Sequence, residues 1–191
     1  VTGMEAHAGP TPMALRKDAM LAATRIMQDV VAAAHRHPPH GRGTVGMVQV
    51  FPNSRNVIPG RVKFSIDLRN STDALVDAMA AEVKAFADQV AKEHGVQVHI
   101  EMVSSYPAQL FQPECVEAVG RAAAKLGYSH MPAVSGAGHD AVYMAKLAPS
   151  GMIFIPCKDG ISHNEIEDAK PEHIEAGCNV LLHAMLERAG T

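Results

Sequence analysis

The spacing of apolar residues predicts two long helices in the first half of the chain. Between about Met13 and His35, apolar side chains recur every three or four positions, at Leu15, Ala19, Ala22, Ile26 and Val30. A second stripe runs from about Thr72 to His94, at Leu75, Met79, Val83, Phe86 and Val90. This repeat is typical of helices with one buried face. Paired prolines after the first stripe and Gly95 after the second predict where the helices end.

Alternation of apolar and polar residues predicts strands around these helices. Segment 61–70 alternates cleanly, and segment 96–103 does so again. Segments 1–9 and 44–52 also read as strands, with a turn at 53–60. The resulting order is strand–helix–strand–strand–helix–strand. It predicts a split βαβ (ferredoxin-like) domain, complete by about residue 105, with two helices on one face of a four-stranded antiparallel sheet.

The pattern changes after the linker-like segment 104–113. A helix is predicted at 113–126, a short strand buried on both faces at 152–156, and a last helix after Pro171. One strand cannot form a parallel sheet by itself. Residues from about 109 onward are therefore expected to be part of a larger α/β domain.

Composition and charge narrow the class of protein. Hydrophobic residues make up 47% of the 191 residues, which is a globular composition. The net charge is −3 with histidine neutral, and no basic run or long apolar stretch favours a nucleic-acid or membrane partner. The three cysteines lack CxxC spacing, so free thiols in a reducing cytoplasm are expected. The sequence starts at Val1 within a strand-like pattern, and a missing upstream segment is expected.

His163 is the first candidate for chemistry. It lies in GISHNEIEDA (160–169), directly after the predicted buried strand, where α/β proteins bind ligands. Asn164 and Glu165 could orient its imidazole toward a metal. The alternative is a loop histidine that caps the turn before the last helix, because no partner at ligand spacing is visible nearby.

Other polar residues are weaker candidates when taken one at a time. His7 ends a strand and could donate to a developing oxyanion, while Arg69 could bind a carboxylate with two hydrogen bonds. Asn56 offers an amide, and the glycines around Ala137 in SGAGHDA expose backbone N–H groups that can hold an anion. In the same stretch Asp140 is suited to cap the following helix. Each of these residues also fits a plain structural role.

Three further patterns carry less weight. The loop HRHPPHG holds His35, His37 and His40, but its spacing is not that of a zinc finger, so a solvated loop with adventitious metal binding is expected. The sequence has no nucleophile elbow, P-loop or dinucleotide motif. Cys115 lacks a partner histidine in its motif, which disfavours a cysteine nucleophile.

Four segments follow one another along the chain: EAHAGPTPM..R.DA, NVIPG.V.FSIDLRN, SGAGHDA and ISHNEIE. Together they resemble the hydantoinase/carbamoylase family of N-carbamoyl-amino-acid amidohydrolases. That group includes allantoate amidohydrolase and β-ureidopropionase, and it belongs to the M20-like metallopeptidases. The likeness covers nearly the whole chain, and the joint order of the segments is more specific than any one of them.

The resemblance implies a two-domain enzyme with two divalent metal ions in an α/β catalytic domain. Residues 1–108 would be the lid or dimerisation domain, and residues 109–191 the C-terminal part of the metal-dependent catalytic domain. Most metal ligands and a glutamate general base would lie upstream of Val1. Zinc or manganese is implied, with cobalt or nickel as alternatives, and this chain alone is not expected to bind both ions.

Matching positions carry over the site residues of the family. His163 resembles the last metal ligand, and His7 resembles the lid histidine that stabilises the oxyanion in the site of the neighbouring subunit. Asn56 and Arg69 resemble the pair that binds the substrate carboxylate. The backbone of the glycine-rich turn would add to this anion site, through Gly136, Ala137 and Gly138, with His139 and Asp140 as support.

The implied reaction is hydrolysis of a ureido (N-carbamoyl) amide in a small substrate that carries a carboxylate, such as an N-carbamoyl-L-amino acid or allantoate. Water activated between two metal ions would attack the ureido carbonyl and release an amino acid, ammonia and carbon dioxide. A homodimer through an exposed edge strand of the lid is implied. Two alternatives stay open: a peptidase or deacylase of the same superfamily and, for this chain alone, a dimerisation module without activity.

Overall fold

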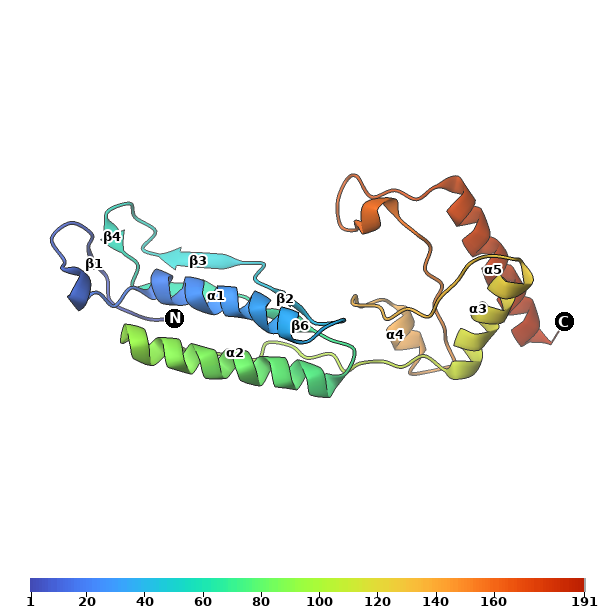
Figure 1. The fold of residues 1–191 in the computed structure, drawn as a ribbon, viewed down its shortest axis with the longest axis horizontal. Helices are drawn as coiled ribbons and strands as arrows, with labels where there is room; N and C mark the ends of the chain where they lie inside the picture. The colour runs from blue at the N-terminus through green and yellow to red at the C-terminus, as the bar shows by residue number, and fades with distance from the viewer. Residues whose placement is uncertain (191) are drawn as a thin grey trace. The chain divides into compact units, whose positions relative to one another are not determined.

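The computed structural model describes residues 1–190 of the chain (Figure 1). The chain divides into two compact units, Val1–Ala108 and Gln109–Thr191. The first unit contains two long helices and all the strands, and the second contains helices joined by irregular segments. Within the described range, no helix is both long enough and apolar enough to cross a lipid bilayer.

Two long helices carry most of the first unit. Helix α1 (Ala19–Arg36) begins after Asp18, whose Oδ1 accepts backbone hydrogen bonds from the first turn at 2.9 and 3.1 Å. Helix α2 (Asp73–His94) begins after Thr72 and ends at Gly95, which has the left-handed φ of +61°. The two helices lie side by side (Figure 1). Both predicted helices are confirmed.

The first helix starts later than its apolar stripe predicts. Met13–Leu15 forms a separate short 3-10 turn, η1. Leu15 is 65% exposed, so it does not belong to the buried face of α1. Because the Asp18 side chain caps the first backbone N–H groups of α1, it sets the start of the helix at Ala19.

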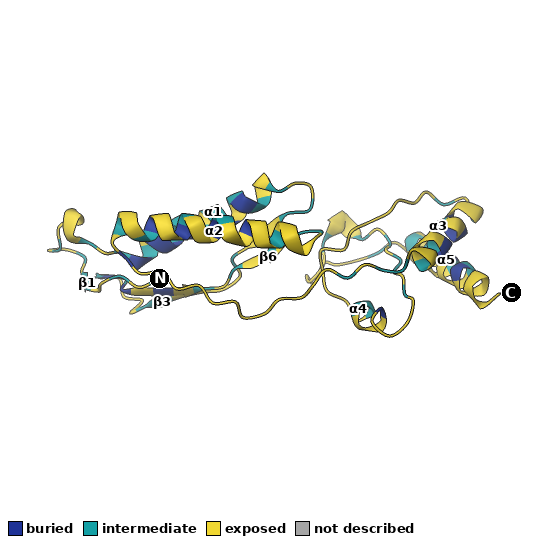
Figure 2. Cartoon of the chain, turned by 90° about the horizontal axis from the view of Figure 1, so that it is seen from below, coloured by how far each residue is buried: buried dark blue, intermediate teal, exposed yellow. Residues whose placement is uncertain are grey.

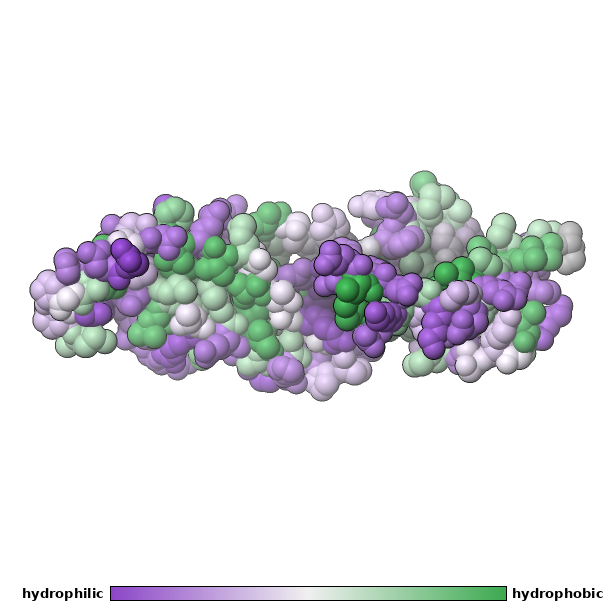
Figure 3. Space-filling view, turned by 90° about the horizontal axis from the view of Figure 1, so that it is seen from above, coloured by the Kyte–Doolittle hydropathy of each residue, from purple (hydrophilic) through white to green (hydrophobic). Residues whose placement is uncertain are grey.

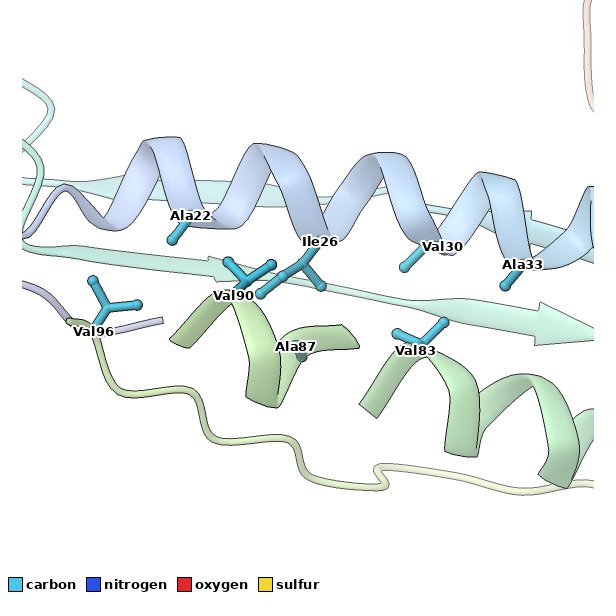
Figure 4. Close-up of a cluster of buried hydrophobic side chains, with 8 residues drawn as sticks. All are labelled: Ala22, Ile26, Val30, Ala33, Val83, Ala87, Val90 and Val96. Carbon is cyan, nitrogen blue, oxygen red and sulfur yellow. The ribbon is translucent and has the colours of Figure 1, made fainter. Parts of the chain in front are cut away.

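A core of branched and small apolar side chains joins the two helices (Figure 4). Ile26 and Val30 of α1 face Val83 and Val90 of α2, and each is at most 2% exposed. Burying one such side chain stabilises the fold by about 1.5–3 kcal/mol. Three strand residues pack against the same cluster: Phe64, Ile66 and Leu68. Buried positions accordingly gather on one side of each helix (Figure 2).

Ion pairs lie at both ends of this helix contact. Arg25 of α1 pairs with Glu93 of α2. Arg36 of α1 pairs with Glu82 of α2, with 2.9 Å between Nε and Oε2. Because the later residue of α1 meets the earlier residue of α2, the helices run antiparallel. His37, which follows α1, adds a contact of 2.7 Å between its Nε2 and Oε1 of Glu82.

The strands form three short antiparallel ladders. β1 (Ala6–His7) pairs with β4 (Val57–Ile58), β2 (Arg42–Thr44) with β6 (Asp67–Arg69), and β3 (Val48–Phe51) with β5 (Arg61–Phe64). The predicted strand at 61–70 is therefore divided into β5 and β6. Between them, Ser65 uses both its backbone N–H and its Oγ to bond Met47, so its side chain takes part in the pairing. The predicted turn at 53–60 contains β4.

The N-terminus links these ladders to the segment after α2. Val1 exchanges backbone hydrogen bonds of 2.8 and 2.9 Å with Val62 of β5. Thr2 exchanges two of 2.8 Å with Gln97. The backbone neighbours therefore follow the order Gln97, Thr2, β5 and β3, and each pair is antiparallel.

The predicted strand at 96–103 was wrong beyond this contact. Gln97 forms the single bridge, and no ladder continues along the segment among the described residues. Met102 and Val103 are 76% and 91% exposed. Alternation marks a segment that suits a sheet, but a strand forms only where a neighbouring backbone accepts its hydrogen bonds.

The second unit is built around two helices. α3 (Pro113–Lys125) and α5 (Pro171–Ala189) both begin with a proline, which is tolerated in the first turn. They pack through a small cluster of buried residues: Ala122, Ala123, Val180 and Ala184. Arg121 of α3 also pairs with Glu187 of α5, with 2.7 Å between Nη2 and Oε1. Both predicted helices are confirmed.

The predicted buried strand at 152–156 was wrong. This segment is irregular, and Phe154 is 55% exposed. The second unit has no strand among its described residues, so the backbone of this segment has no ladder partner. Two short elements flank this segment along the chain: α4 (Ala141–Met144) before it and the 3-10 turn η2 (Lys158–Gly160) after it.

Candidate functional site

The β1–β4 ladder brings His7 and Asn56 together at one end of the first unit. His7 lies opposite Val57 in the ladder. The next residue, Ala8, donates its backbone N–H to the carbonyl of Asn56 at 2.8 Å. Both His7 and Asn56 are exposed. His7 and Asn56, both selected from the sequence, are therefore neighbours in the fold although they are far apart along the chain. We call this end of the unit the His7–Asn56 rim.

The imidazole of His7 is held in one orientation by its own loop. Its Nδ1 accepts a hydrogen bond of 3.0 Å from the backbone N–H of Gly9. In the neutral ring the proton therefore resides on Nε2, which makes Nε2–H a hydrogen-bond donor. The carbonyl of His7 is fixed as well, because Thr11 Oγ1 donates to it at 2.7 Å. The loop thus orients Nε2–H as the free donor of the ring.

Asn56 is held within the β3–β4 connection. Its Oδ1 accepts a hydrogen bond of 3.0 Å from Ser54 Oγ. With its oxygen bound by the loop, the amide offers its amino group as the donor. At this rim the chain therefore presents two hydrogen-bond donors, one from an imidazole and one from an amide.

Arg69 lies at the other end of the same unit, in β6 (Figure 1). From Arg61, at the start of β5, the chain runs extended to Arg69, a span of about 26 Å at ~3.3 Å per residue. Asn56 lies at the Arg61 end of this span, because Arg61 pairs with Phe51 and Phe51 ends the strand that leads into the loop of Asn56. Asn56 and Arg69, predicted as a carboxylate-binding pair, are therefore separated within one copy of the chain.

The guanidinium of Arg69 already binds a carboxylate. Its Nε donates to Asp67 Oδ1 at 2.9 Å and its Nη2 donates to Oδ2 at 2.7 Å. This hydrogen bonding raises the pKa of Arg69 above its ordinary value and lowers the pKa of Asp67 below its ordinary value. Analysis of the sequence missed Asp67, although two residues separated by one position in a strand share a face.

The glycine-rich turn is open and exposed. Ala137 N–H donates to Ser135 Oγ at 3.2 Å, so this N–H points to its own turn. A Cβ at Gly136 or Gly138 would meet nothing within 4 Å, so space within this unit does not require glycine there. The predicted helix cap is different too: His139 Nδ1 accepts from Ala141 N–H at 3.0 Å, whereas Asp140 makes no side-chain cap bond in the described chain.

His163 lies in a tight loop with left-handed backbone. Its φ is +57°, and Asp159 and Gly160 in the same loop have φ of +53° and +68°. Non-glycine residues in this region cost roughly 1 kcal/mol or more and cluster at functional sites. Glu167 accepts the backbone N–H of His163 at 3.0 Å. Asn164, predicted to orient the imidazole, instead accepts the backbone N–H of Ile166 at 3.1 Å.

The described residues do not complete a metal centre. Among residues 1–190, no three histidine, cysteine, aspartate or glutamate side chains gather to hold a metal ion. His163 could supply one imidazole ligand, but a stable site needs three or more ligands. His37, from the histidine-rich loop, is bound to Glu82.

Comparisons with known proteins show that the chain is similar to part of several amidohydrolases. It is 48% identical over 189 residues to the N-carbamoyl-L-amino-acid amidohydrolase of Rhizobium meliloti, covering 99% of this chain and 45% of that protein. It is 31% identical over 183 residues to the allantoate amidohydrolase of Bacillus subtilis (strain 168), covering 96% and 44%. The chain therefore spans somewhat less than half the length of these relatives.

A solved structure and a family match agree with this similarity. The crystal structure of an amidase of the hydantoinase/carbamoylase family from Burkholderia multivorans has a TM-score of 0.93 and 54% sequence identity, covering 98% of this chain and 46% of that chain. Residues 4–187 match Peptidase family M20/M25/M40. The mixed α/β architecture is in keeping with that match. The chain therefore belongs to peptidase family M20/M25/M40.

Proposed function

We propose that this chain is part of a metal-dependent amidohydrolase that cleaves the ureido (N-carbamoyl) amide of a small carboxylate-bearing substrate. N-carbamoyl-L-amino acids and allantoate are the proposed substrates, in line with the names of the relatives. The observation that carries the proposal is the His7–Asn56 rim, where the β1–β4 ladder joins the backbones of two segments that each carry a hydrogen-bond donor. Preset donors of this kind stabilise negative charge that develops during acyl transfer.

Each site residue has a proposed task. The Nε2–H of His7 donates to the oxyanion that forms on the ureido carbonyl. The amide of Asn56 and the guanidinium of Arg69 bind the substrate carboxylate. The backbone of the glycine-rich turn is proposed to line that anion site at Gly136, Ala137 and Gly138, with the Ala137 N–H turning from Ser135 Oγ to the anion.

His163 is proposed as one metal ligand. Its backbone strain supports this role, because a glycine would adopt the same φ at lower cost. Two divalent ions, zinc or manganese with cobalt or nickel as alternatives, would supply an activated water. The other ligands are proposed to come from the part of the relatives' length that this chain does not span, because the described residues do not provide them.

Residues 1–108 are proposed to form a lid and dimerisation domain with the split βαβ arrangement. The backbone order Gln97, Thr2, β5 and β3 supports it, since all these contacts are antiparallel. The packing of α1 and α2 over strand residues also supports it. Residues 109–191 are proposed as the C-terminal part of the catalytic domain.

A homodimer is proposed because one copy separates Arg69 from the His7–Asn56 rim: the span from Arg61 to Arg69 alone is about 26 Å along extended strands. A ureido amino acid is too short to reach both ends. Among the described residues, the edge strand β3 pairs with β5 alone, and its Val48 is 44% exposed. A hollow of about 580 Å³ also opens between α1 and β2, lined by Met27, Gln28, Val31, Gly43, Thr44 and Val45. Apolar side chains gather on one face of this unit (Figure 3).

Sedimentation velocity at micromolar concentration tests the dimer. We expect a dimer for the chain and a monomer for Val48→Lys, because a lysine on an edge strand opposes strand pairing. A monomer for the unaltered chain would contradict the proposal.

A substrate panel tests the reaction in the natural gene product. N-carbamoyl amino acids, allantoate, dipeptides and N-acyl amino acids would be supplied separately, and ammonia and free amino acid would be measured. We expect turnover of a ureido substrate with release of ammonia. Turnover of dipeptides or acyl amino acids alone would favour the second candidate, a peptidase or deacylase, which the family match supports.

The chain by itself is proposed to be a dimerisation module without activity. Calorimetric titration of the 191-residue chain with zinc should show no pair of tight sites, because no group of three ligands exists among residues 1–190. Two tight sites on the chain would refute this part of the proposal.

A further inference from the structure

Arg16 binds the loop that follows His7 at both of its ends. Its Nη2 donates to the carbonyl of Ala8 at 2.7 Å and to the carbonyl of Thr11 at 2.9 Å. Its Nε also donates to the carbonyl of Thr11, at 3.1 Å. One guanidinium therefore fixes the first and last residues of the segment 8–11.

In the described part of the chain, Arg16 bonds to carbonyl oxygens and not to a carboxylate. Arg16 is partly buried, yet within the described residues it forms no ion pair with a carboxylate. Placing a guanidinium away from water has a cost that a carboxylate normally offsets. Here three hydrogen bonds to carbonyl oxygens take its place. Such a residue serves the shape of the loop rather than the charge balance of the surface.

The shape of this loop determines the state of the His7 ring. Gly9 sits in the middle of the segment held by Arg16, and its N–H donates to His7 Nδ1. A Cβ at Gly9 would lie 3.3 Å from Nδ1 and Cε1 of His7, so the ring packs directly on the backbone of Gly9. Moving the loop would break the bond to Nδ1 and free the ring to change tautomer.

We propose that Arg16 is a positioning residue for His7: it fixes the 8–11 loop so that Gly9 N–H binds Nδ1 and the proton stays on Nε2. The part of this inference that concerns catalysis rests on the proposed function of His7 as the oxyanion donor. A donor misplaced by about 1 Å can reduce a rate by about 10²-fold, so a residue that holds the ring in place influences catalysis without touching substrate.

The tautomer of His7 can be measured in the chain itself. Two-bond ¹H–¹⁵N correlation spectra of the ¹⁵N-labelled chain, recorded where the imidazole is neutral, distinguish a bare Nδ1 from a protonated one. We expect unaltered His7 to show a bare Nδ1 and a protonated Nε2. In Arg16→Gln and Arg16→Lys the two nitrogen shifts should move toward each other as the tautomers mix. Gly9→Ala should act in the same direction, because its Cβ pushes on the ring.

Arg42→Lys is the matched control for these spectra. Arg42 also donates to backbone carbonyls, those of Pro39 and Gly41 at 3.1 and 2.9 Å, but it lies in β2, away from His7. Its replacement should leave the His7 shifts unchanged. Backbone spectra beyond residue 20 report whether each variant is folded. An unchanged His7 tautomer in a folded Arg16→Gln chain would overturn the inference, whatever the activity.

Kinetics of the natural gene product test the part of the inference that concerns catalysis. Arg16→Gln should lower kcat by about 10²-fold with little change in KM, which is the pattern of a lost transition-state donor. Adding it to His7→Ala should cost no further activity, because both changes remove one interaction. A full additional loss in the double variant would overturn the catalytic part. If unaltered protein hydrolyses no amide while the tautomer responds as expected, the proposed function fails and the positioning of His7 stands.

Discussion

Asp67 and Arg69 are two positions apart in β6, and the guanidinium proposed to bind a substrate carboxylate already holds one from its own chain. Arg69 also lies opposite Arg42 in the β2–β6 ladder. Two arginines directly opposite each other destabilise a ladder, and Asp67 offsets this repulsion. A substrate carboxylate would therefore meet an arginine that is oriented but partly neutralised.

The pairing makes folding stability depend on pH in a defined direction. The pKa of Asp67 in the fold is lowered below its ordinary 3.8, chiefly by the hydrogen bonds from Arg69. The pair therefore stabilises the fold above about pH 3.8, and this contribution is lost as the pH falls through the folded pKa. Asp67→Asn should lower the free energy of unfolding at pH 7 by less than about 1 kcal/mol, because the pair is half-exposed and solvent screens it.

Urea unfolding at pH 7 and near pH 2 checks this expectation. The difference between Asp67→Asn and the unaltered chain should close at the acid end. Asp77→Asn is the control, since it removes an exposed carboxylate of α2. A difference that stays constant with pH would show that Asp67 acts through shape and not through charge.

His163 offers a second test at the scale of one residue. Replacement by glycine should stabilise the chain by up to about 1 kcal/mol, because its φ of +57° favours glycine. The same change in the natural gene product should lower metal content and activity, since it removes the proposed ligand. Asp159→Gly is the matched control, with φ of +53° in the same loop. Metal analysis and thermal unfolding of both variants test this prediction. Full metal content in His163→Gly would show that His163 is not a metal ligand.

At the scale of elements, the contact between α1 and α2 sets the stability of the first unit. Ile26 is 1% exposed at the centre of this contact. Ile26→Ala should lower the free energy of unfolding by about 2–5 kcal/mol, from lost burial and a cavity. Leu21→Ala, at a 50% exposed position of the same helix, should cost much less. Urea unfolding followed by circular dichroism measures both, and equal losses would place the core elsewhere.

The helices could be predicted from sequence because a helix forms its hydrogen bonds within its own segment. The stripes of Ile26 and Val83 identified both buried faces, except that their first residues, Leu15 and Leu75, are exposed. Strands depend on a partner, which alternation does not identify. Segment 96–103 alternates well, yet only Gln97 finds a neighbour, and segment 152–156 finds none in its unit. The short ladder of β4 was missed because two residues are too few for a pattern.

Sequence patterns pointed to the candidate residues but not to the distances between them. His7 and Asn56 were chosen separately, and the ladder that joins them could not be read from either segment. Nothing in the sequence showed that Arg69 lies at the opposite end of the unit. The role of Arg16 was hidden as well, because its partners are carbonyl oxygens and every residue carries one.

At the scale of the whole molecule, the separation of Arg69 from the His7–Asn56 rim leads to a prediction about shared sites. If a site takes His7 from one copy and Arg69 from another, then His7→Ala and Arg69→Ala should each be nearly inactive in the natural gene product. Mixing the two variants, with unfolding and refolding to exchange subunits, should recover activity. In a mixed dimer one site combines both intact residues and the other combines both altered ones.

Random exchange gives half mixed dimers, so about a quarter of the unaltered activity should return. Each variant refolded alone is the control and should stay inactive. A mixture of His7→Ala with Asn56→Ala is the second control. These two residues lie on the same rim, so no arrangement of subunits would restore both to one site. Recovery with Arg69→Ala but not with Asn56→Ala would establish that a complete site draws on two copies. If neither mixture recovers activity, His7 and Arg69 of one copy must form the same site. The two ends of the unit would then have to move together, which contradicts the shared site.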